Sequence, residues 1–309
     1  MATRSPGCHR RRGYRLPRVA ILTCMGGFTL DDIKAARKPR DSWWTVFLVD
    51  PLACRLALLV ANHTSITPNG LTRLSILLGF GAAGLFATGR LAAGAILFYL
   101  SFTVDCMDGK IARLKGTGTP FGLWLDYVGD RVRILCCAFG FAYGQGASVF
   151  WITATVVVLL DLFRYINAPQ VNRVREATRT LAAARAGGEV VFVEDVLRLT
   201  PQSRVGHLVA THDQPLVDLH RGWRRTFPWF DRFRIFLVRH RVRTHVVGGI
   251  EFHAAVFVIA PPFGPWAMVW AAGVAGALVL LFEAALVYRI WLAAREAGRT
   301  VPKREKVLV

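Results

Sequence analysis

Four aspartates lie in a part of the sequence that is flanked on both sides by apolar segments. They are Asp105, Asp108, Asp126 and Asp130. An ionisable side chain at membrane depth costs free energy, so its presence there indicates a functional site. Carboxylates that crowd together repel one another unless a cation lies between them, and hard divalent cations prefer oxygen ligands. These four residues are therefore candidate metal ligands.

The spacing of the aspartates allows them to converge if they lie on two adjacent helices. At about 100° per residue, Asp105 and Asp108 lie about 60° apart on one helix, and Asp126 and Asp130 lie about 40° apart on the next. Four carboxylates in this arrangement could hold two metal ions, which polarise phosphoryl oxygens. All-oxygen ligation favours Mg²⁺ or Mn²⁺ over zinc. A carboxylate that is less engaged with metal could take a proton from an attacking hydroxyl.

Four smaller or basic residues accompany the aspartates and suit a phosphate-bearing ligand. Gly109 and Gly122 remove side chains where two backbones approach each other or where a ligand lies close. Ala112 is small for the same reason. Arg113 supplies a fixed cation at the mouth of the site, which suits a phosphate.

The composition predicts an integral membrane protein. Hydrophobic residues make up 53% of the 309-residue chain, and about 20 apolar residues of helix cross ~30 Å of hydrocarbon. Six segments are candidate spans, of which the fifth has soft boundaries because it ends at a pair of prolines. They are 67–89, 91–113, 119–142, 147–168, 246–263 and 266–292. We therefore expect an all-α integral membrane protein with six transmembrane helices, an N-terminal surface helix and a cytoplasmic insert.

The basic residues, which give the chain a net charge of +19, are distributed unevenly. If the six spans alternate, three short loops with a single arginine between them fall on one side, and all heavily basic segments fall on the other. The positive-inside rule makes that basic side cytoplasmic. We predict a multi-pass protein of the cytoplasmic membrane whose active site and both termini face the cytoplasm. Attraction to anionic membrane lipids explains the charge, so no nucleic-acid partner is expected.

The segments outside the spans carry separate predictions. Residues 1–40 are a basic segment predicted to be disordered, within which Met25 could be the natural start. Residues 41–65 are predicted to form a juxtamembrane amphipathic helix region, with Trp43 and Trp44 at headgroup level; a seventh span is the alternative. The remaining divisions are a membrane domain over 66–169 and 246–294, a basic cytoplasmic insert over 170–245 and a basic tail over 295–309. Within the insert, the arginine-rich stretch 221–243 is predicted to face the membrane.

Helix signals place the aspartates on neighbouring helices. Thr67 is a plausible N-cap with Pro68 in the first helical position. The stretch from Gly116 to Pro120 contains two glycines, two threonines and a proline, which end one helix and begin another. The two halves of the aspartate pattern should therefore lie on antiparallel helices.

Other polar residues near the spans allow simpler interpretations. Arg131 and Arg133 either pair with the aspartates or bind a phosphate of an acceptor. We expect Asp161 to pair with Arg164 one turn away. Glu251 and His253, at the start of the fifth span, are expected to be solvated. Glu283 is expected to pair with a basic group such as Arg289. The histidines at 207, 212, 220, 240 and 245 are expected at the surface, and the six cysteines are expected to be free thiols.

The stretch from Asp105 to Asp130 resembles the signature of the CDP-alcohol phosphotransferase family, also called CDP-alcohol phosphatidyltransferases. It matches at eight fixed positions, including their spacing, and the entry to the first span, from Thr67 to Thr72, is also similar. The resemblance covers about 60–145 strongly and implies six transmembrane helices, a homodimer and a polar cavity open to the cytoplasm. It also implies transfer of a substituted phosphate from a CDP-linked donor to an alcohol, with release of CMP.

The resemblance also implies roles for individual residues. Asp105, Asp108 and Asp126 would bind two Mg²⁺ or Mn²⁺ ions, and Asp130 would contribute to the metal site and act as the base. The CDP site would be formed by Gly109, Ala112, Arg113 and Gly122. The donor is expected to be CDP-diacylglycerol and the acceptor a polar or phosphorylated alcohol, whose identity the sequence leaves open; a soluble CDP-alcohol donor is the reverse possibility. A prenyl-diphosphate transferase and a divalent-cation transporter are the alternatives to this function.

Overall fold

The structure is a computed structural model that describes residues 27–186, 190–205 and 216–298. It is almost entirely helical. The helices in these ranges are α1 (Leu30–Ala35), a π-helical turn (Thr45–Val49) continuing into α2 (Asp50–His63), α3 (Pro68–Ala87), α4 (Leu91–Lys115), α5 (Pro120–Gln145), α6 (Ser148–Ala186), α7 (Val193–Leu199), α9 (Arg221–Thr226), α10 (Phe230–Arg239), α11 (Gly249–Ala254) with a π-helical turn (Ala255–Ile259) and a 3₁₀ turn (Pro261–Phe263), and α12 (Pro265–Gly298). Two short parallel strands, β1 (Val191–Phe192) and β2 (Leu216–Val217), complete the described part.

The boundaries of α3, α4 and α5 follow from local sequence signals, as predicted. The hydroxyl of Thr67 accepts a hydrogen bond from the backbone N–H of Gly70, and Pro68 begins α3. Gly116 ends α4 with a φ of 65°, a left-handed conformation that costs glycine little. Thr119 then caps α5 in the same way as Thr67 caps α3. The sharp reversal between α4 and α5 is therefore specified by the residues between them.

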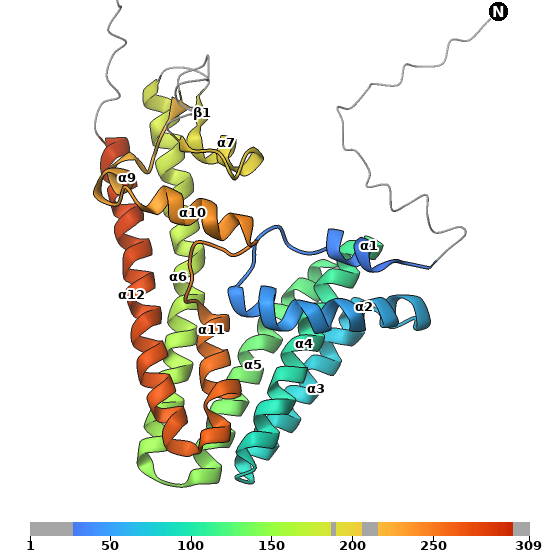
Figure 1. Ribbon diagram of the computed structural model, residues 1–309. Coiled ribbons are helices and arrows are strands. Elements are labelled where there is room, and N and C mark those ends of the chain that lie inside the picture. The colour runs from blue at the N-terminus through green and yellow to red at the C-terminus, as the bar shows by residue number, and fades with distance from the viewer. Residues whose placement is uncertain (1–26, 187–189, 206–215, 299–309) are drawn as a thin grey trace, which may run out of the picture.

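The helices form two groups that pack together along much of their length. α3 packs against both α4 and α5, while α6 packs against α5 and α12. Figure 1 shows α3, α4 and α5 leaning against the group formed by α6, α11 and α12. The loops between α3 and α4, α5 and α6, and α11 and α12 all lie at one end of the molecule.

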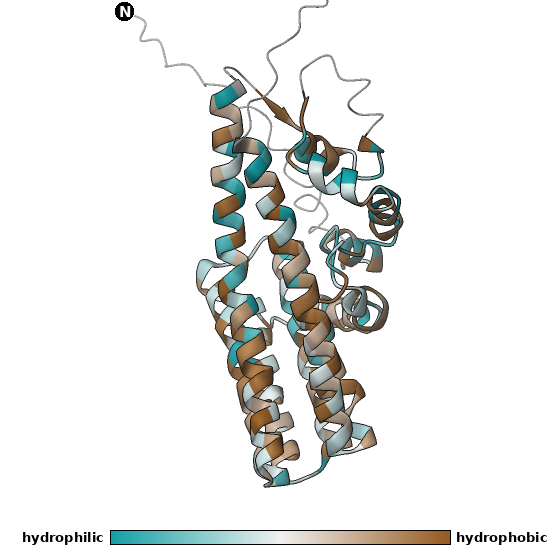
Figure 2. Cartoon of the chain, turned by 90° about the vertical axis from the view of Figure 1, so that its left-hand side faces the viewer, coloured by the Kyte–Doolittle hydropathy of each residue, from teal (hydrophilic) through white to brown (hydrophobic). Residues whose placement is uncertain are grey.

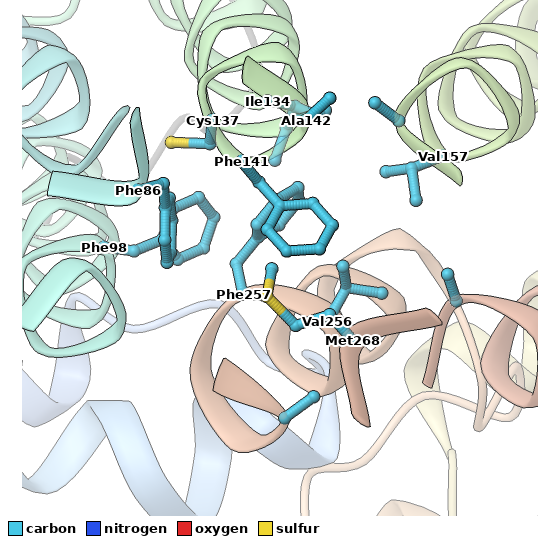
Figure 3. Close-up of a cluster of buried hydrophobic side chains, with 14 of the residues drawn as sticks. Phe86, Phe98, Ile134, Cys137, Phe141, Ala142, Val157, Val256, Phe257 and Met268 are labelled. Atoms are coloured by element: carbon cyan, nitrogen blue, oxygen red, sulfur yellow. The ribbon is translucent and has the colours of Figure 1, made fainter. Parts of the chain in front are cut away.

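A cluster of buried aromatic and aliphatic side chains joins the two groups. Phe86 of α3, Phe98 of α4 and Phe141 of α5 meet Phe257, which follows α11, and Met268 of α12 (Figure 3). The rings of Phe98 and Phe257 have centroids 5.1 Å apart. Because lipid tails are as apolar as these side chains, the close van der Waals packing of the cluster is what contributes cohesion between the groups.

Within the part of the chain that the structure describes, five helices are long and apolar enough to cross a membrane, as expected of a multi-pass membrane protein. They are Thr45–His63, Pro68–Ala87, Leu91–Lys115, Ser148–Arg185 and Pro265–Ala297. Four of them correspond to predicted spans. The predicted span at 119–142 is a helix but carries too many charged residues to qualify by composition, and the one at 246–263 is a shorter apolar helix, Gly249–Phe263. The six-span arrangement therefore stays a prediction.

The helix from Thr45 to His63 meets the length criterion for a span, but it is oriented differently from the others. Figure 1 shows α2 lying crosswise to α3, α4 and α5, near the end opposite the short loops. A buried ion pair between Asp50 of α2 and Lys110 of α4, with 2.9 Å between Oδ1 and Nζ, fixes it there. This orientation is consistent with the predicted surface helix, although its place relative to a membrane stays a prediction.

The N-terminal segment is more ordered than predicted. Residues 1–26 lie outside the described residues, but within 27–40 the chain forms α1, so the prediction of disorder is wrong for this part. Thr29 and Asp32 form a capping box, and Ile33 is completely buried. The sequence does contain a Thr-x-x-Asp capping motif at the start of this helix. The helix is too short to show the hydrophobic periodicity on which the prediction of helices was based.

The two longest helices extend well beyond the thickness of a membrane. At 1.5 Å per residue, α6 with 39 residues is about 58 Å long and α12 with 34 residues about 51 Å. Figure 2 shows these helices mostly hydrophobic in their lower parts, with hydrophilic residues more frequent toward their upper ends. α6 continues from the fourth predicted span into the first residues of the insert, and β1, α7, α9 and α10 pack around these upper ends (Figure 1).

Candidate functional site

Three of the four predicted metal ligands converge between α4 and α5. Asp105, Asp108 and Asp126 each place a carboxylate oxygen within 4.8 Å of the others. Asp108 is buried, while Asp105 and Asp126 are half-buried. We call these three residues the aspartate cluster. These oxygen atoms are close enough together to bind one divalent cation. Mg²⁺ and Mn²⁺ are the ions that fit, because they prefer carboxylate oxygens as ligands.

Hydroxyl groups of α3 hold the aspartate cluster in place, a contribution that the sequence analysis did not identify. Thr72 donates a short hydrogen bond to Asp108, and Ser75 donates one to Asp105 with 3.1 Å between the oxygens. Thr72 and Ser75 follow the Thr67 cap by one and two turns, so a helical wheel of α3 would have placed them on a common face. What they touch depends on tertiary packing, which the sequence pattern does not show.

Asp130, the fourth predicted ligand, lies next to the cluster but is paired with arginines. Arg133, which is 3% exposed as a side chain, forms an ion pair with Asp130 and also lies 3.6 Å from Asp105. Arg131 lies 3.6 Å from the other oxygen of Asp130. Arg133 therefore compensates two acidic residues of the site, which matches the pairing interpretation that the sequence left open for it.

A buried arginine of this kind needs room and hydrogen-bond partners. Arg133 donates to the hydroxyls of Ser75 at 2.8 Å and of Ser101 at 3.2 Å. A Cβ atom at Gly79 would lie 2.7 Å from the Cγ atom of Arg133, so this glycine makes space for the arginine stem. α3 and α4 therefore provide both the space and the hydrogen-bond acceptors that this buried side chain requires.

The predicted nucleotide-site residues line a cavity of about 260 Å³ together with all four aspartates. Gly109, Ala112, Arg113 and Gly122 all contribute to its wall, with Asn69 of α3 opposite. A Cβ atom at Gly122 would overlap the amide oxygen of Asn69, which accounts for the glycine. Arg113 is exposed at the cavity wall, and its Nε donates to the carbonyl of Ala36 at 2.6 Å.

A second cavity of about 100 Å³ adjoins the first on the side of α6 and α11, and we call it the arginine cavity. Asp130 lines both cavities. The charged groups of the arginine cavity come from distant parts of the chain. They are Arg131, Arg133, Asp161, Arg164, Arg243 and His253. Three of these, at 161, 164 and 253, were expected to have simpler structural roles.

The ion pairs around the arginine cavity differ from the predicted ones. Asp161 pairs with Arg131 at 3.1 Å and with His253 at 3.0 Å, rather than with Arg164. Arg164 instead pairs with Glu283 of α12 at 3.2 Å, so Glu283 does pair with a basic group as predicted, but its partner is Arg164 and not Arg289. Sequence spacing favours neighbours on one helix, whereas in a packed bundle the nearest opposite charge lies on another helix.

Several residues expected in solvent are buried. Glu251 and His253, at the start of the segment after the insert, are 6% and 9% exposed, so the predicted solvated helix start is wrong. His220 is 8% exposed and is not at the surface either, whereas His240 is exposed. The histidines at 207 and 212 lie outside the described residues.

The cysteines contribute no ligand to the described part of the site. Cys54, Cys106, Cys136 and Cys137 are free, as predicted, and the other two cysteines lie outside the described residues. Cys106 is half-buried in the wall of the larger cavity and does not belong to the aspartate cluster.

Fold and site together define a helical membrane protein with an all-carboxylate cluster at the edge of a polar cavity. Comparison with known proteins gives a match to the CDP-alcohol phosphatidyltransferase family over residues 65–196. This range contains the aspartate cluster, Asp130 and the predicted nucleotide-site residues. Residues 65–196 therefore form a CDP-alcohol phosphatidyltransferase domain.

Individual relatives match over limited lengths. A bifunctional IPC transferase and DIPP synthase of Aquifex aeolicus is 46% identical over 65 residues, or 21% of this chain and 15% of the relative. A phosphatidylinositol phosphate synthase of Corynebacterium glutamicum is 40% identical over 86 residues, or 28% of this chain and 37% of the relative. An archaetidylinositol phosphate synthase of Methanothermobacter thermautotrophicus is 28% identical over 163 residues, or 52% and 74%. The chain thus spans well under half the length of the first two relatives.

A solved structure is also similar at a low level. The crystal structure of phosphatidylinositol phosphate synthase from Mycobacterium tuberculosis in its apo form is 18% identical, with a TM-score of 0.37. The similarity covers 78% of this chain and 95% of that chain.

Proposed function

We propose that this protein transfers a phosphatidyl group from CDP-diacylglycerol to the hydroxyl of a phosphorylated alcohol and releases CMP. The observation that carries this proposal is the position of Asp130, which lines both the cavity of the aspartate cluster and the arginine cavity. A base in that position can reach a hydroxyl that enters from one cavity and attacks a phosphate held in the other. The proposed activity belongs to phospholipid biosynthesis.

The larger cavity suits the donor. A divalent cation bound by the aspartate cluster would supply positive charge that polarises the phosphoryl oxygens of the donor. Gly109, Ala112 and Gly122 let the CDP group lie close to the backbones of α4 and α5. Arg113 at the wall offers a cation to a phosphate. A lipid donor is favoured because α3 and α4, which line the cavity, are apolar enough to span a membrane.

The arginine cavity suits an acceptor that carries its own phosphate. Arg131, Arg164 and Arg243 line it, and only arginine offers planar donor groups that bind phosphate in a bidentate manner. Two relatives are named as synthases of phosphatidylinositol phosphate and archaetidylinositol phosphate. Inositol phosphate is therefore the acceptor that we propose first for this chain.

The protein's own residues account for the proton. Asp130 would accept the proton of the attacking hydroxyl as the new bond forms between its oxygen and the phosphorus of the donor. The bond from that phosphorus to the oxygen of CMP breaks in the same displacement, and CMP leaves with the electron pair. Arg133 holds Asp130 in place and lies beside Asp105, so it orients the base relative to the aspartate cluster.

Three further parts of the proposal come from the resemblance and from charge. The number of metal ions is proposed as two, in which case Asp130 would turn partly from Arg133 to a second ion. The chain is proposed to pair as a homodimer. The active site and both termini are proposed to face the cytoplasm with the basic insert, since the aspartate cluster lies in the second half of α4 and the first half of α5, away from the short loops.

Purified protein in lipid nanodiscs, supplied with Mg²⁺ and CDP-diacylglycerol, tests the proposal. CMP release is measured with inositol phosphate, inositol, glycerol phosphate and serine as acceptors, and with a prenyl diphosphate in place of the donor. We expect release with a phosphorylated acceptor. We expect the Asp130→Asn variant to lose about 10²–10⁴-fold in kcat, because general-base catalysis contributes this much.

Two controls decide how a failure is interpreted. The Asp130→Asn variant should still bind Mn²⁺, because the three residues of the aspartate cluster remain. The Asp231→Asn variant changes a carboxylate of the insert and should retain full activity. Undiminished CMP release by Asp130→Asn would remove Asp130 as the base, and turnover of the prenyl diphosphate alone would overturn the assigned reaction.

A further inference from the structure

A third polar cavity, of about 320 Å³, lies at the insert and is separate from the two cavities described above. Its walls come from α6, α7, α9, α10 and α12, which meet at the upper end of the molecule in Figure 1. We call it the insert pocket. Arg175 lies about 16 Å further along α6 than Arg164, and Arg289 about 9 Å further along α12 than Glu283, at 1.5 Å per residue. The insert pocket therefore lies about two to three helical turns beyond the arginine cavity.

The insert pocket has a strong excess of positive charge. Seven arginines and a single carboxylate, that of Glu194, line it. Some of the arginines are paired with aspartates behind the wall: Arg179 with Asp195, Arg224 with Asp218 and Arg234 with Asp231. These pairs also show that Arg224 and Arg234, from the stretch predicted to face the membrane, point into the protein.

Three arginines of the insert pocket have no carboxylate within 4 Å among the described residues. They are Arg40 before α2, Arg175 on α6 and Arg289 on α12. Burial and the nearby Arg234 lower the pKa of Arg40. Cations held this close repel one another, and an anion between them would remove that repulsion.

His220 supplies a neutral donor at the centre of this charge. The Nη2 atom of Arg289 lies 3.1 Å from Nε2 of His220, and because arginine only donates, Nε2 must accept. Burial, followed by the charges of Arg289, Arg224 and Arg175, lowers the pKa of His220 to about 2. The imidazole is therefore neutral, with its hydrogen on Nδ1. His220 is 8% exposed, and Nδ1 has no partner among the described residues.

Other buried donors in the insert pocket also lack acceptors. Nε of Arg175, Nε of Arg289 and the indole Nε1 of Trp223 are buried without a partner in the described ranges. All of these groups can only donate. The carboxylate oxygens of Glu194 lack hydrogen bonds too, and burial raises the pKa of Glu194, so a proton can neutralise it when an anion enters. Buried donors without partners cost free energy, which a ligand with several acceptor oxygens would recover.

We propose that the insert pocket binds a phosphate monoester group, carried either by a soluble ester or by a lipid headgroup. A phosphate monoester offers three acceptor oxygens and about two negative charges at neutral pH, which matches the unpaired arginines and the hydrogen of His220 Nδ1. Trp223 and Phe230, with ring centroids 5.7 Å apart, provide an apolar wall for the organic part of the ligand. This site does not depend on the aspartate cluster or on the proposed reaction.

Trp223 gives a local signal for binding. The full chain is labelled with 5-fluorotryptophan and placed in phosphatidylcholine nanodiscs, and the ¹⁹F resonance of Trp223 is identified by its loss in a Trp223→Phe variant. Inorganic phosphate is titrated as the first probe. In a second arm, without free phosphate, phosphatidic acid is added to the nanodiscs. A shift of the Trp223 resonance with phosphate indicates a soluble ligand, and a shift with phosphatidic acid alone indicates a lipid headgroup; either result supports the proposal.

Matched variants separate a built site from general attraction to positive charge. Arg289→Gln should weaken binding by about tenfold or more, because it removes a charge-assisted donor. Arg225→Gln removes the same charge from an exposed residue of α9 outside the pocket and should leave binding unchanged. If Arg289→Gln disturbs the other tryptophan resonances, Arg175→Gln and Arg40→Gln take its place.

Two results would overturn the proposal. The first is a Trp223 resonance that neither probe shifts in the wild-type protein. The second is equal weakening by Arg225→Gln and by the variants in the pocket. The Asp126→Asn variant should retain the shift, so failure of the proposed transferase reaction would leave this result unaffected.

Discussion

At the residue scale, basic side chains compensate only part of the acidic charge of the site. Arg133 pairs with Asp130 and lies 3.6 Å from Asp105, so the guanidinium compensates part of the negative charge around the aspartate cluster. Asp108 and Asp126 have no such cation within ion-pairing distance among the described residues. A divalent cation would therefore find its strongest attraction on the side of the cluster away from Arg133.

Gly122 gives a prediction about the donor cavity. In a Gly122→Ala variant the new methyl group would overlap the amide oxygen of Asn69 and lie 3.0 Å from the hydroxyl of Thr119, which caps α5. We expect kcat/KM for the CDP-linked donor to fall about tenfold or more, because small displacements of a reacting group carry large costs. Steady-state CMP release at varied donor concentration measures this.

Gly84 of the same bundle is the matched control for this prediction. A Cβ atom at Gly84 would meet nothing within 4 Å, and alanine favours a helix more than glycine does. Gly84→Ala should therefore keep wild-type kinetics. Equal kinetics for Gly122→Ala and wild type would show that the close approach of Gly122 to α3 does not matter for the donor.

The candidate ligands could be predicted from the sequence, whereas their partners could not. The spacing of Asp105, Asp108 and Asp126 on two helices joined by a tight turn is a local property, and the structure brings these residues together. The pairing of Asp130 with Arg133 and the hydroxyl support from Thr72 depend on how α3 packs against α4 and α5. Sequence spacing contains no information about such packing, so these contacts appear only in three dimensions.

At the element scale, α3 is the support on which α4 and α5 are assembled. It packs against both helices and contributes Thr72, Ser75 and the gap at Gly79 that admits Arg133. The side chain of Arg133 therefore connects all three helices through Ser75, Ser101 and Asp130. Stability of this group of helices and geometry of the site depend on the same residue.

Removal of the Arg133 charge should destabilise the fold. In an Arg133→Met variant, Asp105 and Asp130 would lose their common partner while remaining partly buried, and such a loss typically costs about 3–5 kcal/mol. We expect a lower Tm in thermal unfolding of the detergent-solubilised protein. Added Mg²⁺ should recover part of the loss, because a cation bound at the cluster replaces some of the missing charge.

Arg90 provides the comparison for this prediction. It is exposed in the loop between α3 and α4, so Arg90→Met removes the same charge without leaving a buried carboxylate. Its Tm should stay close to that of the wild type with and without Mg²⁺. Indistinguishable melting of the two variants would contradict the role assigned to Arg133.

Helix boundaries followed from sequence where caps and turns are local, but not where burial decides. The starts of α3 and α5 at Pro68 and Pro120 agree with the capping signals. The insert could not be derived, because β1 and β2 pair across a long stretch of chain and the basic side chains of α9 and α10 point partly inward. The basic composition of the insert predicted an exposed surface, but ion pairs with Asp218 and Asp231 allow some of its arginine side chains to be buried.

At the scale of the whole molecule, the two ends of the bundle differ in charge. The short loops at one end contain few charged residues, while the insert and the crosswise α2 lie toward the other end (Figure 1). The aspartate cluster lies in the halves of α4 and α5 that are away from the short loops. The sequence predicted this asymmetry from the distribution of arginine and lysine. The orientation of the asymmetry in a membrane stays a prediction, because the positive-inside rule supplies it rather than the fold.

Single cysteines at the two ends test this orientation in intact cells. On a background with the native cysteines replaced by serine, Arg90→Cys and Gly146→Cys should react with a membrane-impermeant maleimide added outside. Arg225→Cys, in the insert, should react only after the membrane is permeabilised. The opposite labelling pattern would reverse the proposed topology and place the aspartate cluster on the outer side.

The proposed reaction depends on a divalent cation held between α4 and α5. Electron paramagnetic resonance of Mn²⁺ added to the full-length protein in nanodiscs measures this directly. We expect wild-type protein to bind Mn²⁺ and so to decrease the signal of free Mn²⁺. The Asp231→Asn variant should decrease it equally, whereas the Asp126→Asn variant should leave it nearly unchanged, because only Asp126 belongs to the cluster. Binding of Mn²⁺ by Asp126→Asn as tight as that of wild type would contradict a cation site between α4 and α5.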